Sequence, residues 1–203
     1  MLPTFYWGTE RERSEQMLKN IGFQGDEWVV GMDFPKNSMP SLYASEDVFG
    51  VTVREYLRLL VIQGYKLIVI VNGHGGENHI RVLERLAKEF TATTDARVLY
   101  TITTFFEGGV QDFGHATQVE TSILSYLHPE CVDVSTLPPK GEPIYNLDYA
   151  VVDDAAFCGH PNADFTVEND PREFSPDLGR KTVEYSVEVI SEKIQREMDQ
   201  IRR

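Results

Sequence analysis

The chain has 203 residues, of which 41% are hydrophobic, and its 19 basic and 32 acidic residues give a formal net charge of −13. This length and composition can bury one sizeable core, so we expect a single domain over residues 1–203. The negative charge argues against nucleic acid or an anionic membrane surface as partners. No apolar run is long enough to cross a membrane, residues 1–9 do not resemble a signal peptide, and only two cysteines are present, so a cytoplasmic location is expected.

The predicted elements alternate between helices and strands along the chain. Strands are expected at residues 2–7, 66–71 and 97–106, and helices at residues 12–21, 46–63, 80–90, 119–127 and 176–201. Ser45 is a typical N-cap and Gly64 a typical C-cap of one helix, and Pro176 suits the first turn of the last. In that last helix, an apolar stripe from Val183 to Ile201 is expected to face the core. This order is typical of a parallel sheet covered by helices.

The segment at residues 66–78, KLIVIVNGHGGEN, changes abruptly from apolar residues to glycine and polar residues. Its β-branched half predicts a strand that is buried on both faces of a sheet. Ligand sites in open α/β sheets lie just beyond the carboxyl ends of the strands, and His74 occupies that place. The alternative is a glycine-rich turn with an incidental histidine, because a short motif is a weak signal by itself.

A second polar segment, GHATQVETS at residues 114–122, follows the next predicted strand. Because parallel strands end at one edge of a sheet, His115 and Glu120 are expected to lie near His74. Imidazole nitrogens and carboxylates together form a usual ligand set for Zn²⁺, Mn²⁺ or Fe²⁺. Taken alone, Glu120 fits equally well as an acid that stabilises a helix N-terminus.

The two segments together resemble the creatininase (creatinine amidohydrolase) family. One is similar to the family's Asn-Gly-His-Gly-Gly-Asn turn, and the other to its His-Ala-Gly-x-x-Glu-Thr-Ser segment, in the same order. The Leu-Pro-x-x-Tyr-Trp-Gly pattern at residues 2–8 is similar to the family's second strand. The resemblance implies a three-layer α/β/α sandwich with a mainly parallel central sheet, assembly into homo-oligomers such as hexamers, and a two-metal site that hydrolyses C–N amide bonds.

The resemblance also implies roles for individual residues. His74 is expected to ligate a divalent metal, and Glu120 to serve as a metal-site carboxylate with a catalytic role. His115 is expected to give a proton to the leaving nitrogen, a step that suits an imidazole near neutral pH. The turn residues expected to orient the site and its small amide substrate are Asn72, Gly73, Gly75 and Gly76.

Three features depart from the family pattern. Nothing in the chain matches the family's N-terminal Glu-x-His-Gly segment, which supplies further metal ligands, so we expect this chain to lack that part of the site. Glu77 is inserted before Asn78, and it is a candidate substitute ligand because creatininase itself carries a carboxylate shortly after the same histidine. Thr117 replaces the glycine after His-Ala, and Gly114 stands where many members have an acid.

Other polar residues receive weaker expectations. His79, in the first turn of a helix, is expected at the surface, and His128 is expected near a helix C-terminus, where it suits the dipole. His160 lies in a predicted loop and is an outside candidate for the pocket. Glu10 follows the first predicted strand and is a candidate for substrate contact, because loops at strand ends often carry function. Glu10 and Asp33 are also candidates for recruitment to the metal.

Two functions remain open from the sequence. The first is a metal-dependent amidohydrolase acting on a small cyclic or linear amide. The second is a non-catalytic creatininase-like domain with an incomplete metal site, which binds a small molecule or a partner. Since a closed site needs about four ligands, we expect weak metal binding or none by this chain. A sheet edge left uncovered by the unmatched segment also favours a homo-oligomer with residues 2–7 near the contact.

Overall fold

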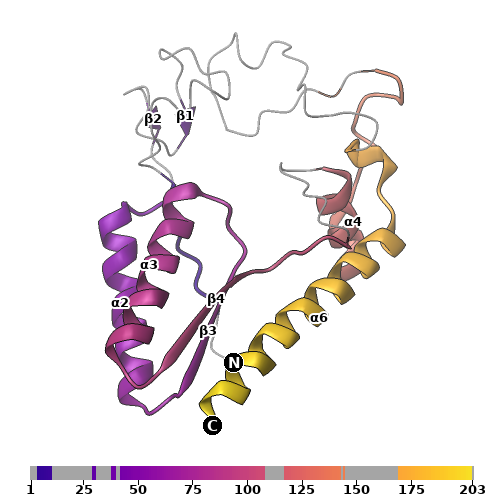
Figure 1. Cartoon of the computed structure of the whole chain (residues 1–203). Helices are drawn as coiled ribbons and strands as arrows, with labels where there is room; N and C mark the ends of the chain where they lie inside the picture. Colours follow the sequence, from indigo (N-terminus) through magenta and orange to yellow (C-terminus); the bar gives the residue numbers. More distant parts are fainter. Residues whose placement is uncertain are drawn as a thin grey trace. The chain divides into compact units, whose positions relative to one another are not determined.

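The structure is a computed structural model (Figure 1) that describes residues 4–10, 29–30, 38–39, 42–107, 117–142, 144 and 169–202. The chain divides into two compact units. The first comprises Met1–Thr103 with Glu192–Arg203, and the second comprises Thr104–Ser191. The expected single domain stays a prediction. None of the helices in the described residues is both long and apolar enough to span a membrane.

The first unit is built around two parallel strands joined by a helix. Strand β3 (Leu67–Asn72) pairs with β4 (Arg97–Ile102) along their whole length, and α3 (Glu77–Thr93) connects them. Strands β1 (Val29–Val30) and β2 (Ser38–Met39) form a second parallel pair. A parallel pair needs such a crossover connection, and α3 provides it between β3 and β4. The α/β class with a parallel sheet, predicted from the sequence, is confirmed.

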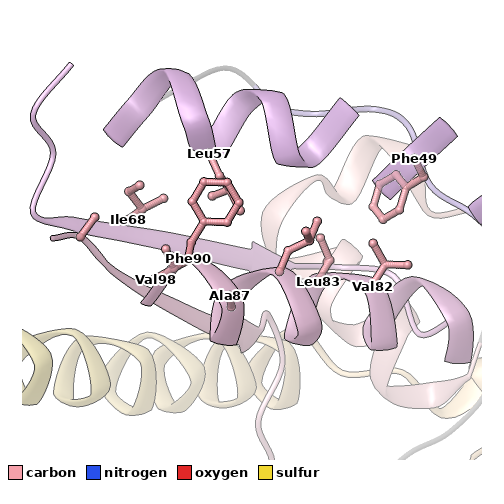
Figure 2. Packing of buried hydrophobic residues seen from close by; sticks show 10 residues of the cluster. Phe49, Leu57, Ile68, Val82, Leu83, Ala87, Phe90 and Val98 are labelled. Carbon is pink, nitrogen blue, oxygen red and sulfur yellow. The ribbon is translucent and has the colours of Figure 1, made fainter. Parts of the chain in front are cut away.

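The core of the first unit lies between α2 (Glu46–Ile62), α3 and the β3–β4 pair (Figure 2). Its buried apolar side chains are Phe49, Leu57, Ile68, Val82, Leu83, Leu86, Ala87, Phe90, Ala96 and Val98. Val82, Leu86 and Phe90 recur at helical spacing, so one face of α3 is buried. Full burial of such a side chain contributes about 1.5–3 kcal/mol, so this cluster stabilises the packing of α2 and α3 on the strands.

Helix α2 begins and ends where the sequence predicted. The Ser45 hydroxyl accepts the Val48 N–H at 3.4 Å, and Gly64 adopts the left-handed φ of 89° beyond the helix end. Both predicted helix signals are therefore confirmed. Two of its apolar residues, Val51 and Ile62, are nevertheless 67% and 66% exposed. The buried residues of α2 are Phe49, Gly50 and Leu57.

At the N-terminus, the expected strand at residues 2–7 is wrong for the residues described there. Thr4 to Gly8 form no strand, and a single parallel bridge joins Thr9 to Ala44. The Ala44 N–H donates to the Gly8 carbonyl at 2.9 Å. One bridge is enough to lay this segment alongside the start of α2. The helix predicted at residues 12–21 lies outside the described residues.

The second unit contains α4 (Gln118–Leu127), the short 3₁₀ helices η2 (Pro129–Cys131) and η3 (Pro171–Glu173), and the first part of α6 (Pro176–Ile201). Helices α4 and α6 approach closely, since a Cβ built on Gly179 would lie 2.0 Å from the Ser122 carbonyl oxygen. The Ser122 hydroxyl accepts the Ser175 N–H at 2.9 Å. The serine of the Glu-Thr-Ser segment therefore anchors the start of α6.

The expected apolar stripe on the last helix is only partly buried, since Val183, Ile190 and Ile194 are half-buried and Val187 is 58% exposed. The fully buried residues of this helix are instead Gly179, Thr182 and Ser186. The Thr182 hydroxyl donates to the Leu178 carbonyl at 2.9 Å, and the Ser186 hydroxyl donates to the Thr182 carbonyl at 2.7 Å. Small residues whose hydroxyls bond within their own helix can be buried without an unpaired polar group. The buried face of α6 is therefore made of small residues that let another helix approach closely, and not of large apolar side chains.

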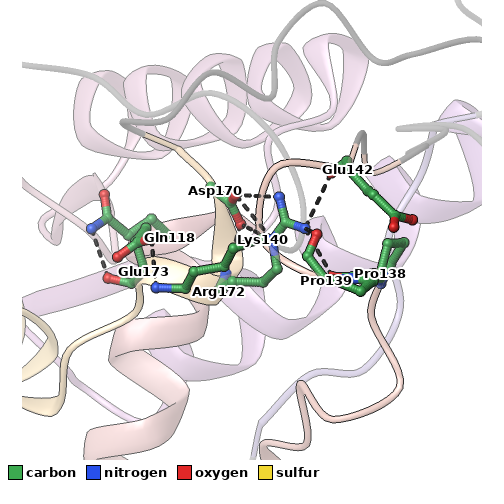
Figure 3. Close-up of polar contacts among 8 residues, drawn as sticks. All are labelled: Gln118, Pro138, Pro139, Lys140, Glu142, Asp170, Arg172 and Glu173. Carbon is green, nitrogen blue, oxygen red and sulfur yellow. Dashed lines mark hydrogen bonds and ion pairs between the residues drawn. The ribbon is translucent and has the colours of Figure 1, made fainter.

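One arginine gathers three peptide carbonyls in the second unit (Figure 3). Arg172 donates to the carbonyls of Pro138, Pro139 and Glu142 at 2.8, 2.7 and 3.1 Å. Its guanidinium also bonds Asp170, with the shortest contact at 2.6 Å, and both side chains are largely buried. These bonds hold the pKa of the Asp170 carboxyl below its usual value. The loop at residues 138–142 is thereby tied to η3.

Candidate functional site

The turn at the carboxyl end of β3 is held by one side chain, Asn72. Its Oδ1 accepts the His74 N–H at 3.0 Å and lies 3.1 Å from His79 Nε2. Its Nδ2 donates to the His74 carbonyl at 2.7 Å and to the Tyr100 hydroxyl at 3.2 Å. Two lone pairs and two N–H groups are thus all used within the chain. Asn72 therefore holds the turn that carries His74, and its expected role toward a substrate stays a prediction.

His74 emerges from this turn and meets Glu10. Nε2 of His74 lies 3.3 Å from Oε2 of Glu10, and the two side chains are 26% and 9% exposed. The ring of Tyr43 lies beside the His74 imidazole, with centroids 5.4 Å apart. Of the two additional metal ligands that the sequence suggested, Glu10 therefore lies beside His74 at the carboxyl end of β3. Asp33 lies outside the described residues.

Glu10 is placed through its neighbour Thr9, which is fully buried. The Thr9 N–H donates to His79 Nδ1 at 3.3 Å, and its hydroxyl accepts from Asn78 Nδ2, also at 3.3 Å. Asn78 and His79 belong to the first turn of α3. The start of this helix therefore holds the segment that carries Glu10 against the turn that carries His74.

The surface position expected for His79 was wrong, since it is only 5% exposed. Its ring stacks on the Phe49 ring, with centroids 4.4 Å apart, and meets the His74 ring edge-on, with centroids 4.9 Å apart. Burial, with a smaller effect of His74, lowers the pKa of His79 to about 4, so the imidazole is neutral near neutral pH. The sequence held a signal for this, because residue 79 continues the buried face formed by Val82 and Leu86.

Two glycines permit this packing. A Cβ on Gly76 would lie 2.7 Å from His74 Nε2 and 3.1 Å from the Thr9 carbonyl oxygen. A Cβ on Gly8 would lie 3.3 Å from His79 Nδ1. Such distances leave no room for a side chain without a shift of the histidines or of the backbone. Gly76 is therefore required by the close approach of the Glu10 segment to the turn.

Glu77 has the position of a helix-terminal acid. It is exposed and lies in the first turn of α3, where a carboxylate stabilises the helix dipole. Of the two roles that the sequence allowed, this placement favours the helix terminus over the metal. A substrate role for Gly73 and Gly75 stays a prediction.

The second predicted segment lies in the other unit. Glu120 is exposed in the first turn of α4, and its N–H donates to the hydroxyl of the N-cap Thr117 at 3.3 Å. Its proximity to His74 stays a prediction, as does its catalytic role. His115 and His160 lie outside the described residues. His128 is the C-cap of α4, which confirms its predicted place.

The Glu10–His74 pair suits a divalent cation by its chemistry. A carboxylate oxygen and an imidazole nitrogen are ligands that Zn²⁺, Mn²⁺ and Fe²⁺ accept, and here both point to one place. Across the part of the chain that the structure describes, no group of three or more His, Cys, Asp or Glu side chains gathers around one point. The described residues thus fit part of a metal site.

Comparisons with known proteins agree with these observations. A family profile described as creatininase, creatinine amidohydrolase, matches residues 27–194. A creatininase mutant complexed with creatine has a similar structure, with 21% identity, a TM-score of 0.51, and coverage of 79% of this chain and 69% of that one. A second creatininase mutant gives 20% identity, a TM-score of 0.51, and coverage of 79% and 68%. No curated protein sequence matches significantly. The profile spans most of the chain, and the chain belongs to the creatininase family.

Proposed function

We propose that this protein is a metal-dependent amidohydrolase that hydrolyses a C–N amide bond of a small cyclic or linear amide. The observation that supports this proposal is the convergence of Glu10 and His74, 3.3 Å apart, at the carboxyl end of β3. This is the edge at which open α/β sheets place their ligands. Membership of the creatininase family supports a hydrolase that acts on amides.

In this proposal, His74 and Glu10 hold a divalent ion, with Zn²⁺, Mn²⁺ or Fe²⁺ as candidates. Such an ion, when bound, polarises a substrate carbonyl and lowers the pKa of water. Asn72 fixes the backbone on both sides of His74, so the imidazole is held before any ligand arrives. The family resemblance assigns His115 to proton transfer toward the leaving nitrogen and Glu120 to the metal-site carboxylate.

The substrate class follows from the family and from the similar structure. One solved neighbour is a creatininase complexed with creatine, which supports a small polar molecule as the ligand here. We also propose a cytoplasmic homo-oligomer. The support for this is the low cysteine content and the tendency of the family to form hexamers. Light scattering would give several times the chain mass of 23.1 kDa for an oligomer and one chain mass for a monomer.

The test is an amide-hydrolysis screen on the full chain with added Zn²⁺ or Mn²⁺, using small lactams and linear amides. We expect turnover that a chelator abolishes and that returning the metal restores. His74→Gln and Glu10→Gln should each lower kcat/KM by about a hundredfold or more, because metal ligands and their immediate support carry effects of that order.

The matched control is His128→Gln, which changes an exposed histidine in the other unit. It should leave turnover unchanged. Chelator-insensitive turnover, or turnover that survives both His74→Gln and Glu10→Gln, would overturn the proposal. Binding of a small amide without any turnover would favour the non-catalytic alternative.

A further inference from the structure

His79 makes one hydrogen bond to each of the two segments that carry the candidate metal donors. Its Nδ1 accepts the N–H of Thr9, the residue before Glu10, at 3.3 Å. Its Nε2 lies 3.1 Å from Oδ1 of Asn72, the residue that holds the backbone of His74. A single imidazole therefore spans the two segments.

The partners of His79 define its tautomer. A peptide N–H can only donate, so Nδ1 of His79 must be the unprotonated acceptor in its contact with Thr9. The proton of the neutral ring then lies on Nε2, where it points at the acceptor Oδ1 of Asn72. The assignment of Oδ1 is supported independently, since the same atom accepts the His74 N–H. Both ring nitrogens are thus used, and each has a single possible role.

The surroundings keep this ring in one place. His79 stacks on the buried Phe49 at 4.4 Å, and Gly8 leaves the space that its Nδ1 edge occupies. With both nitrogens bonded and one face packed, rotation of the ring would break two hydrogen bonds inside a buried environment. Each buried polar group left without a partner costs about 1–3 kcal/mol, which favours the single orientation.

We propose that His79 is a positioning residue, which holds the Glu10 segment and the His74 turn together so that their side chains face one divalent cation. This inference rests on the proposed function for the identity of that cation. His79 itself does not contact the ion, because both of its ring nitrogens are already engaged. It acts through Thr9 on one side and through Asn72 on the other.

Three substitutions test the bonds of His79 to Thr9 and to Asn72, together and one at a time. His79→Phe keeps a ring against Phe49 and removes both hydrogen bonds. His79→Asn retains an acceptor near the Nδ1 position, which faces Thr9, and loses the donor to Asn72. His79→Gln retains a donor near the Nε2 position, which faces Asn72, and loses the acceptor for Thr9. Val98→Ala, at a buried position of β4, is the control for simple loss of core stability.

The first readout needs neither metal nor substrate. Hydrogen–deuterium exchange of the full chain should become faster at residues 4–10 in His79→Phe and His79→Gln, and stay slow there in His79→Asn. Exchange at residues 72–76 should become faster in His79→Phe and His79→Asn, and stay slow in His79→Gln. Unchanged exchange at both segments in His79→Phe, or uniform acceleration like that of Val98→Ala, would overturn the positioning role.

The second readout is a Zn²⁺ or Mn²⁺ titration of the same folded variants. Loss of residues that orient metal ligands weakens metal binding by about tenfold to a hundredfold, so His79→Phe should show that loss and Val98→Ala should not. Metal affinity unchanged in His79→Phe would contradict the inference. If the wild-type chain binds no metal, the proposed function fails, and the exchange pattern still decides whether His79 couples the two segments.

Discussion

Oε2 of Glu10 lies 3.3 Å from Nε2 of His74. The two residues are far apart in the sequence, since Glu10 lies near the N-terminus and His74 directly follows strand β3. Neither residue is held by its own segment alone. Thr9 fixes Glu10 to the first turn of α3, and Asn72 fixes His74 to the end of β3. The candidate donor pair is therefore a product of tertiary packing around a parallel strand end, which makes it sensitive to small changes in that packing.

Gly76→Ala should weaken metal binding. The new Cβ would lie 2.7 Å from His74 Nε2 and 3.1 Å from the Thr9 carbonyl oxygen, so the imidazole or the Glu10 segment must move. We expect about a tenfold loss of metal affinity, measured by calorimetric titration, since misplacing a ligand has effects of this order. Gly75→Ala is the matched control, because a Cβ there meets nothing within 4 Å. Equal losses in the two variants would contradict this account.

Gly179→Ala should destabilise the second unit. Its Cβ would lie 2.0 Å from the Ser122 carbonyl oxygen, and backbone atoms cannot turn aside as a flexible side chain can. Overpacking of this kind typically costs about 1–3 kcal/mol, and we expect a loss at or above the top of that range. Urea denaturation measures it, with the exposed helix position Glu188→Ala as control. A variant as stable as the wild type would show that α4 and α6 are farther apart.

Thr117→Ala should cost about 1 kcal/mol of unfolding free energy, because it removes the hydroxyl that accepts the Glu120 N–H at the start of α4. Thr117→Gly should cost only a few tenths by comparison, since glycine is a tolerated N-cap. This explains how the chain departs from the glycine of the family segment without losing the helix. The opposite order of the two variants in urea denaturation would exclude the capping role.

Acid should remove the stabilisation that Asp170 provides. Arg172 holds the pKa of Asp170 below its usual value of 3.8, so the contribution is fully present above that value. It is lost as the pH falls through the lower pKa of the folded state. We expect Asp170→Asn to cost about 2 kcal/mol near neutral pH, a typical value for charge-assisted bonds, and less in acid. A cost that stays the same in acid would contradict the ion-pair origin. Asp177→Asn, which removes exposed ion pairs to Arg180 and Lys181, should cost much less, because solvent screens exposed pairs.

The sequence predicted the elements whose signals are local. The run of β-branched residues gave β3, Ser45 and Gly64 marked the ends of α2, and Pro176 marked the start of α6. Such signals act within a few residues, through backbone conformation and hydrogen bonds at helix ends. The family motif likewise lay in contiguous residues, so its place after a strand could be predicted.

The sequence did not predict which side chains are buried, because burial depends on which surfaces pack against each other. Helix α2 carries apolar residues on more than one side, so periodicity did not decide that Leu57 is buried and Ile62 exposed. Helix α6 buries Thr182 and Ser186 because their hydroxyls bond within the helix, a property that hydropathy does not register. The buried position of His79 could have been predicted from the apolar face of α3, but its bond to Thr9 could not, because that partner lies 70 residues away in the sequence.

The most direct test of the central claim is a calorimetric titration of the dialysed 203-residue chain with Zn²⁺ or Mn²⁺, repeated on Glu10→Gln and His74→Gln. The ligand count in the sequence predicted weak metal binding or none. If Glu10 and His74 hold a divalent ion, the wild type instead binds it saturably, and each variant loses about tenfold or more in affinity. Absence of saturable binding by the wild type, or equal affinity in all three proteins, would contradict the claim that Glu10 and His74 form the metal site.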